Sequence, residues 1–412
     1  MEWDLIVVGG GAAGVFAALA AAEANPNLRI LVLEKGSLPL AKVKISGGGR
    51  CNVTHACYDP DRLVEFYPRG GRELLGPFHR FQPADAMRWF EERGVALKTE
   101  ADGRIFPISD SSQTIIDCLL GHARRLGVQL RAHAPVERIQ PPDEGTPFQV
   151  ELRGGETLAA RKVLLASGGG RGGMALAASL GHTIQPPVPS LFTFTIQDPR
   201  LTGLAGVSVE RTRLRLVEVG LEEEGPLLIT HWGLSGPAAL RLSAWGARAL
   251  HSAHYRTDLR INWIPFAAPE EVSRALSQTR AVAPRQRPFA HVPAGIEAPG
   301  ARLPLRLWQR LVAAAGFGET DTWAQASNQV VARLAGELTG GLYRIQGKGE
   351  FKEEFVTCGG VALDEVDFRT MESRVCHGLY LAGEVLDIDG LTGGFNFQSA
   401  WTTGWLAGKA IG

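Results

Sequence analysis

The chain has 412 residues, of which 45% are hydrophobic and 21% are charged. That length can bury a substantial core and exceeds the size of most single domains. Its 43 basic and 43 acidic residues balance, which excludes a global positive field that would attract nucleic acid or an anionic membrane. We therefore expect a globular protein of two or three domains.

The cysteines and the N-terminus bear on the compartment. The cysteines are Cys51, Cys57, Cys118, Cys358 and Cys376. They form no C-x-x-C pair and are odd in number, which argues against a zinc ribbon or a disulfide framework, and we predict no metal site. Glu2 and Asp4 replace the basic start of a signal peptide, and no apolar run reaches the roughly 18 residues that cross a bilayer. These features predict a cytoplasmic protein.

The beginning of the chain predicts a βαβ unit, with apolar strands at 5–8 and 28–33 and an alanine-rich helix at 12–24. Gly9, Gly11 and Gly14 form G-x-G-x-x-G between the first strand and the helix, and Glu34 ends the next strand. The glycines permit a tight turn, let a pyrophosphate approach the backbone and let helix and strand pack closely. The helix start attracts phosphate, and Glu34 accepts hydrogen bonds from an adenosine ribose. This unit predicts a dinucleotide site.

Three consecutive glycines follow in the loop after the second strand. Such a run is costly to order and usually marks close approach to a ligand or another backbone. The segment reads Ser46, Gly47, Gly48, Gly49, Arg50, Cys51 and Asn52. Its last three residues supply polar groups beside that approach. A flexible surface loop with an incidental thiol is the alternative.

The next part of the chain alternates helices and strands. Helices are predicted at 85–93 and from Ser111 or Ser112 to Gly127, and a strand follows at 128–131. Residues 148–152 and 157–159 predict a hairpin before an apolar strand at 163–166. Residues 167–170, which include Gly168, form a second strand-to-glycine turn that lies either near the cofactor or in a purely structural role. The alternation predicts a mostly parallel sheet with helices on its faces.

From about Pro186 the pattern changes to proline-punctuated segments, with an alternating strand at 211–219 and helices at 270–277 and 305–315. This indicates an insertion of strands and helices. The sheet pattern resumes near Phe355 and closes with a strand at 378–382 and a final helix. We therefore expect an α/β fold in which 1–187 and 351–412 form one Rossmann-like domain and 188–350 forms the insert.

The C-terminal strand leads into a second candidate cofactor segment. The segment contains Gly383, Glu384, Asp389, Gly390, Gly393, Gly394, Phe395, Asn396, Phe397 and Gln398. The combination of a strand, a carboxylate, a glycine loop and a helix start thus occurs both at the beginning of the chain and near its C-terminus. An extended FAD uses both, with its pyrophosphate on the first helix and its flavin on the last, where the helix start favours the charge of a reduced flavin. A glycine-rich turn with a solvated Glu384 is the alternative.

Five ordered motifs together resemble the bacterial HI0933-like flavoprotein family. They are VVGGGAAG (7–14), ISGGGRCNVT (45–54), ITHWGLSGPA (229–238), TMES (370–373) and GEVLDIDGLTGGFNFQSAWTTGWLAG (383–408). The resemblance spans the whole chain. It implies a glutathione-reductase-like FAD domain interrupted by an insert with a β-barrel part and a small helical part.

Position by position, the resemblance implies noncovalent FAD held by one set of residues. The set is Gly9, Gly11, Ala13, Gly14, Glu34, Lys35, Gly47, Gly48, Gly49, Arg50, Cys51, Asn52, Gly383, Glu384, Gly394, Asn396 and Phe397, to which the motifs add Gly168 and Phe395 and the fold analogy adds the backbone of Val136 at the adenine. Two departures bear on substrate geometry. His55 stands where relatives tend to have asparagine, and the stretch after Gly168 lacks the usual serine- and threonine-rich continuation.

Relatives act in reactions from bile-acid-type oxidoreduction to dihydrouridine formation in ribosomal RNA, so the reaction does not transfer with the fold. Our leading hypothesis is an FAD-dependent oxidoreductase with NAD(P)H as transient donor. It moves a hydride to or from a carbon–carbon bond of a small molecule bound between the FAD domain and the insert. Arg50 is the candidate to polarise a carbonyl, and Cys51 or His231 to supply the proton. Cys51 is more often a small packed residue than a catalyst, and a satisfied interior histidine is the alternative for His231.

Three alternatives remain. The same flavin chemistry on a uridine of ribosomal RNA needs a basic surface, for which the candidates are Arg256, Arg260, Arg280, Arg285 and Arg287. A solvated face is the simpler interpretation of these scattered arginines. The chain can also be a flavin-binding sensor without turnover. A serine hydrolase is remote, because the segment 233–237 lacks the last glycine of G-x-S-x-G. Nothing in the sequence indicates the oligomeric state.

Overall fold

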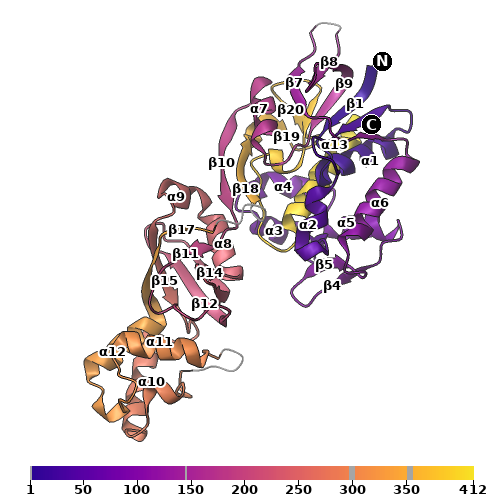
Figure 1. Ribbon diagram of the computed structural model, residues 1–412. Helices are drawn as coiled ribbons and strands as arrows, with labels where there is room; N and C mark the ends of the chain where they lie inside the picture. Colours follow the sequence, from indigo (N-terminus) through magenta and orange to yellow (C-terminus); the bar gives the residue numbers. More distant parts are fainter. Residues whose placement is uncertain (1, 144–145, 297–301, 350–355) are drawn as a thin grey trace. The chain divides into compact units, whose positions relative to one another are not determined.

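The computed structural model describes residues 2–143, 146–296, 302–349 and 356–412 (Figure 1). The chain divides into two compact units: Met1–Val188 with Val356–Gly412, and Pro189–Phe355. We call them the cofactor unit and the insert unit. The domain limits expected from the sequence stay predictions, and the second limit, between residues 350 and 351, lies outside the described residues. So does Phe355, where the sheet pattern was expected to resume.

The cofactor unit is built on a sheet whose central strands run parallel. Their order is β21 (Leu379–Leu381), β9 (Thr157–Leu165), β1 (Glu2–Val8), β2 (Ile30–Leu33) and β6 (Gln129–Arg131). Residues 5–8 and all of β2 are buried, as in parallel strands covered on both faces. α1 (Ala12–Ala24) joins β1 to β2, which confirms the predicted βαβ unit.

β9 corrects one prediction. The sequence indicated a hairpin strand at 157–159 and a separate strand at 163–166, but the structure has one continuous strand. Its first half pairs antiparallel with β8 (Phe148–Leu152), which pairs with β7 (Val136–Gln140), and its second half pairs parallel with β21. Arg161 and Lys162 interrupt the apolar pattern without interrupting the strand, which is why the prediction was wrong.

Helices and short strands complete the cofactor unit. They are α2 (Ala41–Gly49), β3 (Thr54–His55), α3 (Pro60–Leu63), η1 (Val64–Phe66), α4 (Gly71–Phe78), α5 (Pro83–Glu91), β4 (Leu97–Thr99), β5 (Arg104–Pro107), α6 (Ser112–Arg125), α7 (Arg171–Ser179), β10 (Ile184–Ser190), β18 (Val356–Val361), η4 (Leu363–Glu365), β19 (Val366–Asp367), β20 (Glu372–Ser373), η5 (Gly383–Val385) and α13 (Phe395–Ile411). α5 begins before the predicted residue 85, because Asp85 accepts a hydrogen bond from the Gln82 amide and so stabilises the helix start there. Ser111 caps α6 as predicted.

α1 and α13 pack against each other (Figure 1), and small residues form the contact. A Cβ on Gly404 would lie 2.6 Å from the Ala13 carbonyl oxygen, and one on Gly408 would collide with the Ala17 carbonyl oxygen. The residue numbers increase in the same direction along both helices from one contact to the next, so the helices run parallel. Gly404 lies at the level of Ala13, so Phe395 lies eight residues before the level of Ala12, where α1 begins. At 1.5 Å per residue, the start of α13 therefore lies about 12 Å beyond the start of α1.

The insert unit contains an antiparallel sheet. Its strands are β11 (Phe194–Thr195), β12 (Ser208–Leu216), β13 (Glu222–Ile229), β14 (Gly233–Ser235), β15 (Thr257–Asn262), β16 (Gly341–Ile345) and β17 (Gly347–Lys348), in the order β16-β15-β12-β13-β14-β11-β17. β16 and β17 follow each other in the chain but pair with β15 and β11, which lie toward opposite ends of that order. The segment 341–348 therefore links the two ends of the sheet. β12 begins and ends earlier than the predicted strand at 211–219.

Helices pack with this sheet in one hydrophobic core that includes Trp263, Trp308 and Trp323. The helices are α8 (Pro237–Trp245), α9 (Ala247–Ser252), α10 (Pro269–Val282), η2 (Pro288–Ala290), α11 (Leu305–Ala315), η3 (Trp323–Gln325) and α12 (Asn328–Gly340). α11 has the predicted limits, and α10 extends beyond the predicted 270–277. Among the described residues, no helix has both the length and the apolar character to cross a membrane.

Candidate functional site

Two of the G-x-G-x-x-G glycines are required by close backbone packing, and the third leaves open space. Gly9 has a φ of +117°, and a Cβ there would collide with the Ala166 carbonyl oxygen; a Cβ on Gly14 would collide with the Gly9 carbonyl oxygen. A Cβ on Gly11 would meet nothing within 4 Å. α1 begins directly after Gly11 without a side-chain cap or an acidic residue in its first turn. The backbone N–H groups there fit a phosphate.

Glu34 connects this turn to the loop after β2. Its Oε2 accepts a hydrogen bond from the Gly10 amide at 2.9 Å, and its Oε1 accepts one from the Gly36 amide at 2.7 Å. Each carboxylate oxygen keeps a second lone pair for a ribose hydroxyl. Val136, the expected adenine neighbour, begins β7, and Lys35 lies close to Gly170 in the turn after β9.

The turn after β9 meets the C-terminal cofactor segment. Gly168 has a φ of +71°, and a Cβ there would lie 3.7 Å from the Glu384 carboxylate. Glu384 accepts hydrogen bonds from Lys42 at 2.7 Å and from the Thr357 amide at 3.1 Å. A Cβ on Gly383 would lie 2.7 Å from the Ala13 side chain. The fold therefore brings the two distant glycine motifs to the same end of α1.

The glycine triplet segment reaches the start of α13. A Cβ on Gly394, the residue before α13, would lie 2.6 Å from the Thr54 carbonyl oxygen and 2.9 Å from Asn52 Oδ1. Thr54 donates a hydrogen bond to Gln398 at 2.6 Å. Asn396 exchanges 2.8 Å hydrogen bonds with the Gly390 backbone, and α13 carries no side-chain cap. The start of α13 is thus held in place while its amide groups stay available.

The triplet itself is a distorted end of α2. Gly47, Gly48 and Gly49 have positive φ values, and a Cβ on either of the last two would meet nothing within 4 Å. Cys51 also has a positive φ, of 60°, and its side chain is fully buried. Burial raises the pKa of the Cys51 thiol to about 12. Phe397 stacks on Trp401, with 5.6 Å between ring centroids.

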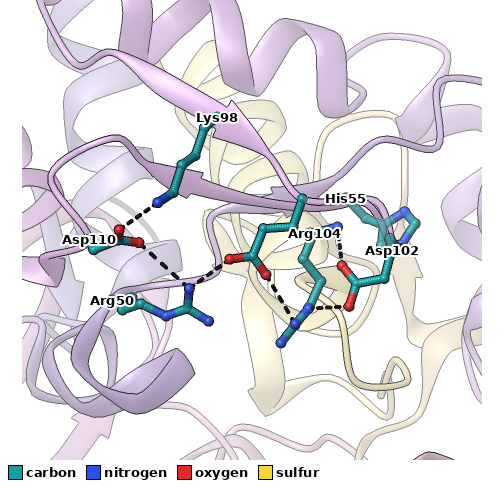
Figure 2. Close-up of polar contacts among 7 residues, drawn as sticks. Arg50, His55, Lys98, Asp102, Arg104 and Asp110 are labelled. Carbon is teal, nitrogen blue, oxygen red and sulfur yellow. Dashed lines mark hydrogen bonds and ion pairs between the residues drawn. The ribbon is translucent and has the colours of Figure 1, made fainter.

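Arg50, at the end of α2, joins a row of alternating charges on β4, β5 and the loops that follow these two strands (Figure 2). Its guanidinium lies 2.7 Å from Glu100 and 3.6 Å from Asp110, and 4.0 Å from the centre of the Phe106 ring. The hydrogen bond to Glu100 is the main reason that the pKa of Arg50 is raised. These contacts fix the orientation of a charged group beside the triplet. No motif in the sequence marks Glu100, Phe106 or Asp110.

An aromatic cluster surrounds the first residue of α13. The Phe395 ring stacks on Phe66 at 4.4 Å and on His55 at 4.7 Å, and the Tyr67 hydroxyl donates a 2.7 Å hydrogen bond to the Phe395 carbonyl. Arg69 forms an ion pair with Asp389 close by. The sequence singled out His55 only as a departure from a family pattern, and it gave no signal for Phe66, Tyr67 or Arg69.

The remaining candidate residues lie in the insert unit. His231 is exposed at the turn between β13 and β14. Arg256, Arg260, Arg285 and Arg287 are exposed and, in the part of the chain that the structure describes, form no ion pair. Arg280 instead donates hydrogen bonds to the Ala326 carbonyl and to Asn328. No group of three or more metal-ligating side chains occurs among the described residues.

The model of the HI0933-like protein Rossmann domain matches residues 3–410. The chain belongs to the HI0933-like family. The 3-dehydro-bile acid delta(4,6)-reductase of Clostridium scindens is 29% identical over 98% of each chain. The ribosomal RNA dihydrouridine synthase of Escherichia coli is 31% identical over 100% of this chain and 98% of its own length.

Solved structures show the same fold. The 3-ketosteroid delta1-dehydrogenase from Sterolibacterium denitrificans superposes with a TM-score of 0.53 at 14% identity, over 100% of this chain and 99% of that one. This likeness concerns the fold alone. Together with the HI0933-like family match and the parallel sheet, it confirms the predicted α/β class with a Rossmann-like FAD-binding domain, the fold of the FAD-dependent oxidoreductases.

Proposed function

We propose that this HI0933-like protein is an FAD-dependent oxidoreductase that transfers a hydride between the flavin and a carbon–carbon bond, with NAD(P)H as donor. One observation supports this most: α1 and α13 run parallel, both start without a side-chain cap, and their starts are offset by about 12 Å. Two such starts suit the two ends of one extended dinucleotide.

When bound, FAD supplies the hydride chemistry, so the chain must bind, orient and handle one proton. The open backbone at Gly11 would hold the pyrophosphate, Glu34 the ribose, and the start of α13 the flavin ring. The residues that the family resemblance assigns to FAD remain proposed contacts. Asn52 Oδ1 and Ser167 Oγ are buried without a hydrogen-bond partner among the described residues, and Asn52 beside α13 fits a ligand there.

Arg50 is the proposed carbonyl-polarising residue. The names of the two relatives above, a delta(4,6)-reductase and a dihydrouridine synthase, both denote hydrogen addition to a carbon–carbon double bond. A guanidinium held by Glu100 and Phe106 keeps its charge and orientation, and it would stabilise negative charge that develops on a conjugated carbonyl oxygen. Complete burial of Cys51 favours packing over proton transfer. His231 remains a proposed proton donor that substitution can test.

The substrate we favour is a small molecule with a conjugated carbonyl. A uridine of ribosomal RNA is the second candidate, because the Escherichia coli relative matches the whole chain. The exposed Arg256, Arg260, Arg285 and Arg287 would meet its phosphates. Salt-sensitive retention of ribosomal RNA and appearance of dihydrouridine after incubation with NAD(P)H would support the RNA. Turnover of a conjugated ketone without RNA binding would support the small molecule.

The first experiment is a visible spectrum of the purified protein before and after heat release, followed by anaerobic addition of NADH or NADPH. We expect released FAD and bleaching of the flavin band by one nicotinamide. A colourless protein that FAD does not reconstitute would refute the proposal. A yellow protein that no reductant and acceptor pair can cycle would leave FAD binding intact and favour the non-catalytic sensor.

Substitution of Arg50 tests the proposed polarisation. We expect Arg50→Met to lower turnover by about tenfold to a thousandfold while FAD stays bound, since loss of one oxyanion-stabilising group has that effect. Arg131→Met is the matched control, because Arg131 is the exposed last residue of β6 and likewise forms an ion pair, with Glu156. Equal turnover in the Arg50 variant and the control would remove Arg50 from the mechanism.

A further inference from the structure

The ring of His55 is fixed in one orientation. Its Nε2 lies 3.2 Å from the Asp102 carbonyl oxygen, it stacks on Phe395, and a Cβ on Gly103 would lie 2.5 Å from its Cε1. A carbonyl oxygen can only accept, so Nε2 carries the hydrogen in that contact. In the neutral ring Nδ1 is then an acceptor. It is buried and has no hydrogen-bond partner among the described residues.

Asn52 presents a second acceptor of the same kind. Its Oδ1 is buried and has no hydrogen-bond partner within the described ranges. The two acceptors are close in sequence and flank the start of α13: Oδ1 lies against Gly394, and the His55 ring lies against Phe395. Buried acceptors without a donor are unfavourable. Two of them at one helix start indicate a ligand that brings an N–H group.

The start of α13 supplies the complementary groups. No side chain caps it, and its first turn has no acidic residue, so its backbone N–H groups can donate to a ligand carbonyl. Donors and acceptors side by side next to aromatic rings match the edge of a planar imide, in which an N–H lies between two carbonyls. The flavin ring has such an edge. The site therefore fits the ring that the proposed function places there.

We propose that Asn52 Oδ1 and His55 Nδ1 share the single N–H of the flavin imide edge in a three-centre hydrogen bond, and that His55 makes cofactor binding depend on pH. This deepens the proposed function and rests on it. Protonation of Nδ1 replaces the acceptor by a donor, so the contact is lost as the pH falls. Burial lowers the pKa of His55, the Asp102 backbone and charge raise it, and the Arg104 charge lowers it. The other rings against His55, Phe66 and Phe395, carry no charge.

The test is a titration of the full-length apoprotein with FAD, monitored by flavin fluorescence. The titration is repeated at pH values from about 7.5 to about 5. We expect the wild-type affinity to weaken once the pH falls below the pKa of His55, by at most about tenfold per pH unit, because one proton competes with the ligand for Nδ1. His55→Asn keeps an acceptor that does not titrate, so its affinity should stay flat. His55→Phe keeps the stack without an acceptor and should bind about tenfold more weakly at the higher pH.

His79→Asn is the matched control, because it removes an exposed histidine at the end of α4 and should retain the wild-type pH profile. Thermal unfolding checks that each variant is folded; if His55→Phe is not, the wild-type and His55→Asn profiles decide alone. An equal pH response in wild type and His55→Asn would overturn the inference and leave FAD binding intact. Absence of FAD binding at every pH would instead overturn the proposed function.

Discussion

Arg69 and Asp389 form a bidentate ion pair, and Asp389 is fully buried. Their backbones are also paired as an isolated antiparallel bridge. The neighbouring Leu391 amide donates a 2.9 Å hydrogen bond to the Phe66 carbonyl. These contacts anchor the segment that leads into Gly393, Gly394 and α13. The position of the proposed flavin-binding helix start therefore depends on residues far away in the sequence.

Arg69→Met should be strongly destabilising. It leaves the Asp389 carboxylate buried without its counter-charge, which typically costs about 3–5 kcal/mol. Urea unfolding of the FAD-free protein measures this. The double variant Arg69→Met/Asp389→Leu removes both charges and should recover most of the loss. A single variant as stable as wild type would show that the pair does not anchor this segment.

Gly11 and Gly14 should respond differently to substitution. Gly11→Val should abolish FAD binding with a small effect on the unfolding midpoint, because a side chain there enters space that the proposed pyrophosphate requires. Gly14→Val should lower the midpoint even without FAD, since its Cβ collides with the Gly9 carbonyl oxygen. Thermal unfolding with and without FAD separates the two effects. Equal loss of stability in both variants would contradict these roles.

The contact between α1 and α13 should tolerate no side chain at Gly404. Gly404→Val forces the helices apart and should cost about 1–3 kcal/mol in the free energy of unfolding. Gly121→Ala is the control, because Gly121 lies inside α6 with open space around it. That variant should gain about 0.5–1 kcal/mol. Urea unfolding that ranks the two variants the other way would refute close packing of α1 on α13.

Cys51 should be protected from alkylation. Burial raises its pKa to about 12 from the 9.0 of an unperturbed thiol, and only the thiolate reacts readily. Iodoacetamide with peptide mass mapping should label the partly exposed Cys57 and spare Cys51 until urea unfolds the protein. The folded state holds the Cys51 proton more tightly, so this contribution to stability is present below pH 9 and lost as the pH rises toward about 12. Labelling of both thiols at one rate would contradict the burial.

The sequence predicted those parts of the fold and site that depend on local patterns. Gly9 and Gly14 are required by contacts within one strand-turn-helix unit, so spacing alone reveals them. The start of α13 was predicted for the same reason, from its strand, glycines and helix pattern. The family resemblance then linked the two ends of the chain, which no local pattern does.

The remaining parts depend on contacts between distant residues. Arg69 and Asp389 are 320 positions apart, and neither stands in a pattern that names its partner. The stack of His55 on Phe395 has the same cause. The continuous β9 was missed because Arg161 and Lys162 interrupt its apolar pattern, at the point where its partner changes from β8 to β21.

Two neighbouring strands form the junction between the cofactor unit and the insert unit. β10 and β18, the strands that flank the insertion, are hydrogen-bonded neighbours. A chain that departs on one strand and returns on its neighbour needs only a short connection to close, which is the condition under which domain insertion and exchange are tolerated. This junction would allow one insert to replace another while the strand order of the cofactor unit stays unchanged.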